Sequence, residues 1–113
     1  MSRAKYGRHL PAFILLFLAQ QPSYGLGLLN KMSEQMPRNN ADSAAIYRAL
    51  RVLEEDNAVA AYWDTSEAGP AKKWYQITDI GLRKLADFKD DIEMRKQNME
   101  FFLTHYNMLF DKE

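Results

Sequence analysis

The chain has 113 residues, of which 47% are hydrophobic and 27% charged, and it contains no cysteine. This length and composition indicate one soluble globular domain, and the lack of cysteine excludes disulfides and thiolate chemistry and fits a cytoplasmic location. The two histidines, His9 and His105, are too far apart in sequence to form a metal-ligand motif, so we expect no metal site and no cofactor.

The formal net charge is zero, with 15 basic and 15 acidic side chains, but the charges are unevenly distributed. Residues 1–78 hold nine basic and seven acidic residues, whereas residues 79–113 hold six and eight. The basic residues gather locally at Arg3, Lys5 and Arg8, at Arg48 and Arg51, and at Lys72 and Lys73. A near-neutral total argues against a nucleic-acid binder, but local basic groups of this kind permit one.

Residues 1–9 are polar and basic and predict a loose N-terminal arm. A first helix is expected to begin near Leu10, with Pro11 in its first turn, and to stop at Pro22. Its apolar run, Phe13 to Ala19, is much shorter than the ~20 residues that span a bilayer. The run therefore predicts a buried helix and no membrane partner.

Two further helices are expected before residue 58. Ser23 is a candidate cap for a second helix, which Met36 and Pro37 end. Asp42 or Ser43 is expected to cap a third helix, whose buried stripe is spaced at four and three residues: Ile46, Leu50 and Leu53.

The segment after the third helix predicts a β-hairpin. The alternation of Val59, Ala61 and Trp63 with Ala60, Tyr62 and Asp64 predicts a half-buried strand. A returning strand is expected from Trp74 to Thr78. The turn contains Gly69-Pro70 and is followed at once by Lys72 and Lys73. A helix followed by a basic hairpin is typical of a winged helix-turn-helix, in which the helix enters the major groove and the hairpin meets the flanking backbone.

A last helix is expected from Thr78 or Asp79 to about Phe110. It exposes more apolar surface than one isolated helix can hide, and therefore predicts a homodimer. The expected dimer-interface residues share its apolar rows: Leu85, Phe88, Ile92, Met99, Phe102, Tyr106 and Leu109. Some of them are also candidates for lining an effector pocket, and plain interface packing is the alternative.

Four segments, in this order, resemble the PadR family of bacterial transcriptional regulators over roughly residues 10–110. They are Tyr24-Gly25 at the second helix, Ile46–Glu54 on the third, Gly69–Tyr75 in the hairpin, and Thr78–Gly81 at the last helix. The chain departs from the family pattern at Ala44-Ala45, where a Gly-Ser-like pair is usual, and at Arg48, where proline is usual.

The resemblance implies a mostly α fold with a small β-hairpin. It implies an arm (1–9), a winged helix-turn-helix domain (10–78) and a C-terminal dimerisation helix (79–113). It also implies a homodimeric repressor on a pseudo-palindromic double-stranded operator. Within the family, Trp63–Ser66 followed by Gly69–Lys72 resembles the polyhydroxybutyrate-responsive repressors, which suggests a small hydrophobic or polymer effector.

The expected DNA-binding residues lie on or near the third helix and the hairpin: Tyr24, Asn39, Asn40, Ser43, Tyr47, Arg48, Arg51, Lys72 and Lys73. For the tyrosines the alternative is a packing role, and for the arginines a solvated face or a pair with Glu54 or Glu55. Lys72 and Lys73 point to opposite sides of a strand, so one of them is expected to reach the DNA backbone.

The sequence also bears on two other function classes. A winged-helix protein-interaction module that never binds DNA is favoured by the near-neutral charge and disfavoured by the basic hairpin. An enzyme is not expected, because the sequence shows no nucleophile–base arrangement, phosphate loop or metal cluster.

Overall fold

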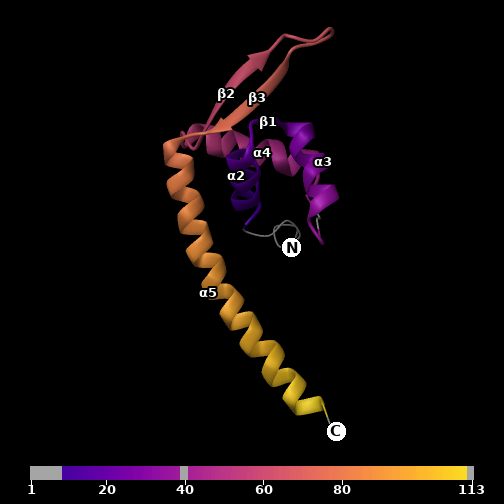
Figure 1. Cartoon of the computed structure of the whole chain (residues 1–113), viewed down its shortest axis with the longest axis vertical. Coiled ribbons are helices and arrows are strands. Elements are labelled where there is room, and N and C mark those ends of the chain that lie inside the picture. The colour runs from indigo at the N-terminus through magenta and orange to yellow at the C-terminus, as the bar shows by residue number, and fades with distance from the viewer. Residues whose placement is uncertain (1–8, 39–40, 112–113) are drawn as a thin grey trace.

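A computed structural model describes residues 9–38 and 41–111 of the chain. Three short helices and a small sheet form a compact head, from which one long helix extends (Figure 1). The elements are α2 (Leu10–Gln20), β1 (Ser23–Tyr24), α3 (Gly25–Gln35), α4 (Ser43–Glu55), β2 (Val59–Asp64), β3 (Lys72–Ile77) and α5 (Asp79–Phe110). The mostly helical fold with a hairpin and a long last helix is confirmed, but the antiparallel sheet has three strands, in the order β1-β3-β2.

The core of the head is built around α2. Ile14 and Leu15 of α2 are fully buried against side chains of α3 and α4. The stripe predicted on α4 is confirmed, because Ile46, Leu50 and Leu53 all lie in this core. The apolar run of α2 is therefore a core helix, and none of the helices among the described residues is long and apolar enough to cross a membrane.

The prediction that Ser23 caps the second helix is wrong. Ser23 is buried in β1 opposite Tyr75, and Tyr24 lies opposite Trp74, so both residues have extended backbone. Helix α3 begins one residue later than a Ser23 cap requires, at Gly25, and its N-cap residue Tyr24 makes no side-chain capping bond. Pairing with β3 satisfies the backbone of Ser23, and this tertiary contact overrides the local capping preference.

Helix α4 begins and ends as its sequence predicts. The Asp42 carboxylate accepts a hydrogen bond from the Ala45 amide at 2.9 Å, which is the expected cap. At the other end Asn57 has a φ of 61°, the left-handed conformation that ends many helices. The Ala58 amide then donates to the Leu53 carbonyl at 2.8 Å, which turns the chain directly into β2.

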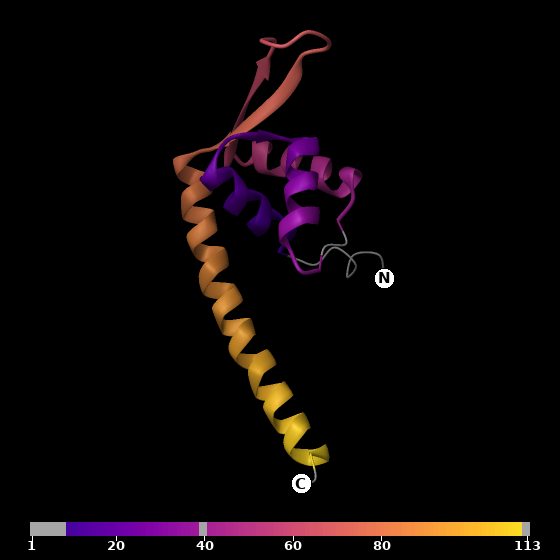
Figure 2. The same ribbon diagram turned by 45° about the vertical axis from the view of Figure 1, so that its right-hand side comes forward.

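Strands β2 and β3 form a hairpin that projects beyond the helices (Figure 2). Near its base Val59 and Tyr75 are buried against the core. Further out, Trp63 is 64% exposed, so the strand predicted to be half-buried is buried only near its base. The alternation is kept, but the distal half of the hairpin extends past the helices that would have covered this side chain.

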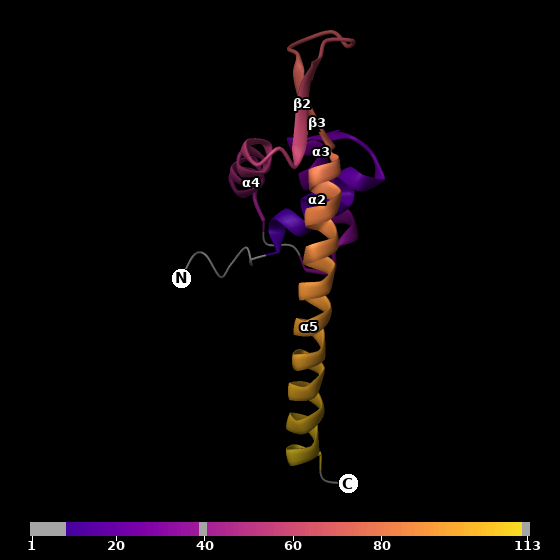
Figure 3. The same cartoon turned by 90° about the vertical axis from the view of Figure 1, so that its left-hand side faces the viewer.

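Helix α5 contacts the head over its first half, and its second half extends away from the head. The Thr78 hydroxyl accepts a bond from the Gly81 amide at 3.1 Å and donates to the Asn57 carbonyl at 2.6 Å, which confirms Thr78 as the cap. A Cβ at Gly81 would collide with the Ala58 carbonyl, so glycine allows this close approach. The first half of α5 packs beside α2 and the second half leaves the head (Figure 3).

Candidate nucleic-acid interface

The outward face of α4 carries four of the residues expected to bind DNA. Ser43, Tyr47, Arg48 and Arg51 are all exposed, because the opposite face of the helix is held in the core. Within the described part of the chain, neither Arg48 nor Arg51 has a hydrogen bond or an ion pair. Both guanidinium groups are therefore available to an outside partner, and the pairs with Glu54 or Glu55 that the sequence allowed are not formed.

Tyr47 combines packing with exposure. Its ring lies over Gly25 at the start of α3, where a Cβ would come within 2.5 Å of the ring Cζ and 2.7 Å of the hydroxyl oxygen. The side chain is nevertheless 47% exposed. Glycine at this position lets α3 approach α4, and this approach fixes the Tyr47 ring while leaving part of it accessible.

Lys73 joins the hairpin to α4. Its Nζ donates a hydrogen bond to Glu54 Oε1 at 3.2 Å and lies 5.6 Å from the centre of the Tyr75 ring. The hydrogen bond to Glu54 raises the pKa of Lys73 above its ordinary value of 10.5. The contact also gives a reason for an acidic residue at the C-terminal end of α4, which is unfavourable for the helix dipole alone.

Lys72 and Tyr24 lie on the opposite face of the sheet from Lys73. Lys72 Nζ is 4.7 Å from the centre of the Tyr24 ring and 3.8 Å from Glu67 Oε1. The Tyr24 ring in turn packs against Trp74, with centroids 5.1 Å apart. The structure therefore divides the expected residues into a group on α4 with Lys73 and a second group behind the hairpin.

Trp63 is a candidate that sequence reasoning missed. It lies directly opposite Lys73 in the register of the hairpin and so shares the face that points toward α4. Its alternation with Val59 and Ala61 predicts a half-buried strand and does not show where along the strand burial ends. The nearby charged turn was the only signal in the sequence that this end of the strand reaches solvent.

Two residues of the expected interface, Asn39 and Asn40, lie outside the described residues, as do the basic residues of the predicted arm, Arg3, Lys5 and Arg8. Asn39 and Asn40 come four and three residues before Ser43, the first residue of α4, so they remain candidates on their place in the sequence alone.

The residues expected at a dimer interface fall into two groups along α5. Leu85, Phe88 and Ile92 are half-buried beside α2. The distal group is exposed, with Phe102 at 63%; its members are Met99, Phe102, Tyr106 and Leu109.

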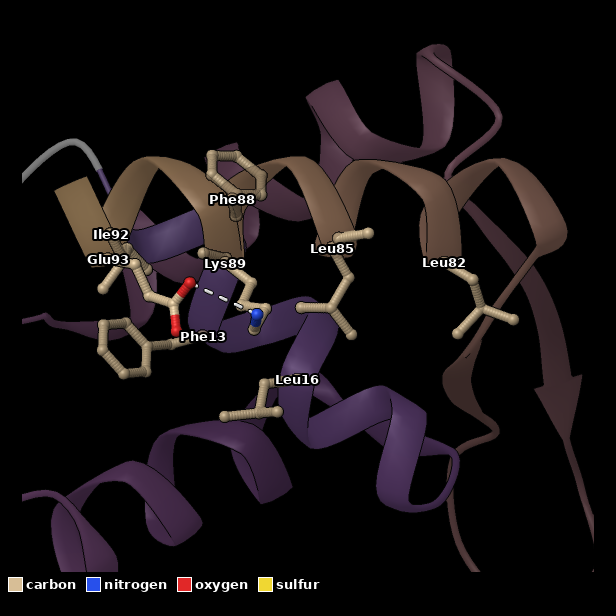
Figure 4. Close-up of a pocket in the computed structure, with 10 residues that line it drawn as sticks. Phe13, Leu16, Leu82, Leu85, Phe88, Lys89, Ile92 and Glu93 are labelled. Atoms are coloured by element: carbon tan, nitrogen blue, oxygen red, sulfur yellow. Dashed lines mark hydrogen bonds and ion pairs between the residues drawn. The ribbon is translucent and has the colours of Figure 1, made fainter.

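A cavity of about 480 Å³ lies between α2 and α5 (Figure 4). Its lining is almost wholly apolar, and Phe13 and Leu16 of α2 face α5 across it. An ion pair between Lys89 and Glu93 at 3.3 Å lies along the α5 side. The apolar lining suits a hydrophobic molecule; the cavity is lined by Ala12, Phe13, Leu16, Leu82, Leu85, Ala86, Phe88, Lys89, Ile92 and Glu93.

The beginning of α2 is tied to the middle of α5 through Asp91. His9 Nε2 donates to Asp91 Oδ2 at 3.0 Å, and Arg95 Nε donates to the same oxygen at 2.9 Å. The hydrogen bond from His9, followed by that from Arg95, holds the pKa of Asp91 below its ordinary value of 3.8. His9, the last residue of the predicted arm, is therefore part of the packed structure.

Comparison with known proteins identifies relatives of this chain. Residues 14–87 match the model of the transcriptional regulator PadR-like family. A probable transcriptional regulator of Mycobacterium tuberculosis is 37% identical over 78 residues, which are 68% of this chain and 41% of that longer protein.

Two solved structures share the fold. A conserved protein of unknown function, described as a potential transcriptional factor, has a TM-score of 0.80 and 29% identity, with 97% of each chain covered. PadR of Bacillus subtilis, solved with operator DNA, has a TM-score of 0.67 and 24% identity, covering 72% of this chain and 46% of that one.

Proposed function

Because the chain belongs to the PadR-like family of transcriptional regulators, we propose that it is a homodimeric repressor, released from its operator by a hydrophobic effector. The chain is a DNA-binding regulator and not an enzyme. The repressor role, the dimer and the effector are the parts that the proposal adds.

The observation that carries the proposal is the outward face of α4. Exposed Arg48 and Arg51, without partners among the described residues, can bond base edges or phosphates in a major groove. Ser43 and Tyr47 add hydroxyls to the same face, and Asn39 and Asn40 complete the proposed set at its N-terminal end. The Bacillus subtilis relative, which was solved with operator DNA, supports a DNA partner for this fold.

Of the two hairpin lysines, Lys73 is on the side of α4, and we assign it to the DNA backbone beside the groove. Lys72 and Tyr24 face the other way. Because they are on the face turned away from α4, they are the weaker members of the proposed set.

The dimer is supported by the distal part of α5. Phe102 and Tyr106 are exposed on a helix that leaves the head, and a second copy can bury them. A two-fold dimer reads a two-fold site, so the operator is pseudo-palindromic.

The effector is supported by the apolar cavity between α2 and α5, since a ligand there can alter the angle between α5 and the head. A polyhydroxybutyrate-like ligand is the finer hypothesis.

Selection of bound sequences from a random duplex library, at near-physiological salt, tests the proposal. We expect an inverted repeat, whose spacing gives the distance between the two α4 helices. Arg48→Ala should weaken binding to the enriched duplex by roughly tenfold, because one base or phosphate contact is lost. Lys96→Ala removes one positive charge from α5, far from α4 in sequence, and is the matched control.

No enriched sequence, together with equal residual binding by the wild type and Arg48→Ala, would contradict a DNA reader. The winged-helix protein-interaction module would then be the better description.

A further inference from the structure

We propose that Trp63 is a DNA-contacting residue, whose indole packs against the sugars and base edges of the minor groove next to the major groove that α4 enters. This inference rests on the proposed function. It adds an apolar contact to an interface that the sequence describes only by its charged and polar residues.

The register of the hairpin fixes the direction of Trp63. Directly opposed residues of neighbouring strands share one face of a sheet, and Trp63 lies opposite Lys73. Lys73 in turn bonds to Glu54 on α4 at 3.2 Å. Trp63 is therefore on the face of the hairpin that turns toward α4, the side of the proposed DNA interface.

Most of the Trp63 side chain is exposed to solvent. Trp63 is 64% exposed, whereas Tyr75, two residues from Lys73 on the same face, is 5% exposed. A large apolar side chain in water at the projecting end of a hairpin contributes little to the fold. Its exposure is better explained by a partner that buries it.

The surroundings of Trp63 identify DNA as this partner. Lys73, opposite Trp63 in the register, is paired with Glu54, and the exposed face of α4 adds Arg48 and Arg51, which have no ion pair among the described residues and can complement phosphates. A hairpin that crosses the backbone beside a major groove reaches the adjacent minor groove, where apolar side chains can press on sugars and base edges. An indole offers a large rigid face for that contact and an N–H for a base or phosphate acceptor.

Tyr62 provides a matched control on the same strand. It is an aromatic residue, 43% exposed, and it lies opposite Trp74 on the other face of the hairpin. Trp63→Ala and Tyr62→Ala therefore remove comparable rings from adjacent positions, but only one of them faces α4.

The test measures binding of the full chain to a fluorescein-labelled duplex of the enriched sequence, by anisotropy over a range of salt concentrations. We expect Trp63→Ala to weaken binding by roughly tenfold, the usual effect of removing one aromatic contact to a nucleic acid. The salt dependence should stay the same, because no charge is removed. Tyr62→Ala should bind as the wild type does, and thermal melting should show both variants folded.

Indole fluorescence gives a second readout that does not depend on affinity. The duplex should quench the emission of the wild type, and most of this change should be lost in Trp63→Phe, which retains Trp74. Wild-type affinity in Trp63→Ala, an equal loss in Tyr62→Ala, or an unchanged emission at saturation would overturn the inference while the proposed function stands. If the wild type itself binds no duplex, both fail together.

Discussion

Single residues set the shape of the α4 surface. Gly25 lets α3 approach closely enough for the Tyr47 ring to lie over it, and Asn57 takes the left-handed turn that joins α4 to β2. Gly81 allows the start of α5 to touch the Ala58 carbonyl. Each of these residues determines how another element is placed.

Gly25→Ala tests the first of these contacts. The added Cβ must displace the Tyr47 ring, and we expect a loss of about 1 kcal/mol in the free energy of unfolding. In a Tyr47→Ala background the same substitution should be neutral or stabilising, because alanine favours a helix and the clash is gone. Urea unfolding of the four proteins measures the difference; an equal loss in both backgrounds would show that Tyr47 is not the cause.

At the scale of elements, ion pairs connect the end of α4 to the segments that follow it. Glu54 bonds Lys73 of β3, and Asp56 lies 3.8 Å from Lys84 of α5. These lysines offset the acidic residues that would otherwise be unfavourable at the C-terminal end of a helix. Ion pairs therefore help to hold the hairpin and α5 in their orientation relative to α4.

Glu54→Gln should separate stability from DNA binding. The exposed pair stabilises the fold by no more than about 1 kcal/mol, and the variant should lose no more than that at neutral pH. Since the pKa of Lys73 is raised, the contribution of the pair is present below pH 10.5 and is lost as the pH rises through the raised value. Wild type and variant should therefore converge in stability at high pH.

The same variant frees Lys73 for phosphate. We expect tighter DNA binding and a salt dependence of the binding constant that is steeper by about one unit. Anisotropy titrations at several salt concentrations measure both quantities. Weaker binding would mean that Glu54 is needed to hold Lys73 in its binding position.

The contact between the start of α2 and the middle of α5 predicts that the stability of the fold also depends on pH in the acidic range. The pKa of Asp91 is lowered, so its contribution to stability is present above 3.8 and is lost as the pH falls through the lowered value. Asp91→Asn should be less stable than the wild type at neutral pH, and the difference should shrink in acid. Unfolding curves between pH 7 and pH 2 would test this, with Asp90→Asn, an exposed neighbour, as the control.

The whole molecule is elongated, with extents of 63 × 27 × 26 Å, because α5 continues well past the head. Its distal part carries a row of exposed aromatic and aliphatic side chains, and neighbouring rings such as Phe102 and Tyr106 stack along it. A single head cannot bury this surface. A second copy can, and this is the basis of the proposed dimer.

Phe102→Glu should weaken that dimer. Placing a charge in an apolar contact of both protomers should raise the dissociation constant at least about 30-fold, the effect of losing one strong interface residue. Analytical ultracentrifugation should show the wild type at twice 13.2 kDa and the variant shifted toward the monomer. Gln97→Glu adds a negative charge elsewhere on α5 and should remain dimeric; a monomeric wild type would contradict the proposal.

The sequence by itself determined the order of the described helices and of the β2–β3 hairpin, though not strand β1. Their signals are local: the Asp42 and Thr78 caps, the spacing of Ile46 and Leu50, and Asn57 at the end of α4 all act within a few residues. The same local patterns identified the exposed arginines of α4, because a helix that buries one face must expose the other.

The tertiary structure decided what depends on distant neighbours. Ser23 is a strand residue because it pairs with β3, and Trp63 is exposed because the hairpin extends past the helices. The Glu54–Lys73 bond and the separation of Lys72 from α4 follow from the register of that hairpin. Burial, ion pairing and strand pairing depend on residues that are far apart in the chain. A periodic pattern in the sequence does not show which distant residues come together.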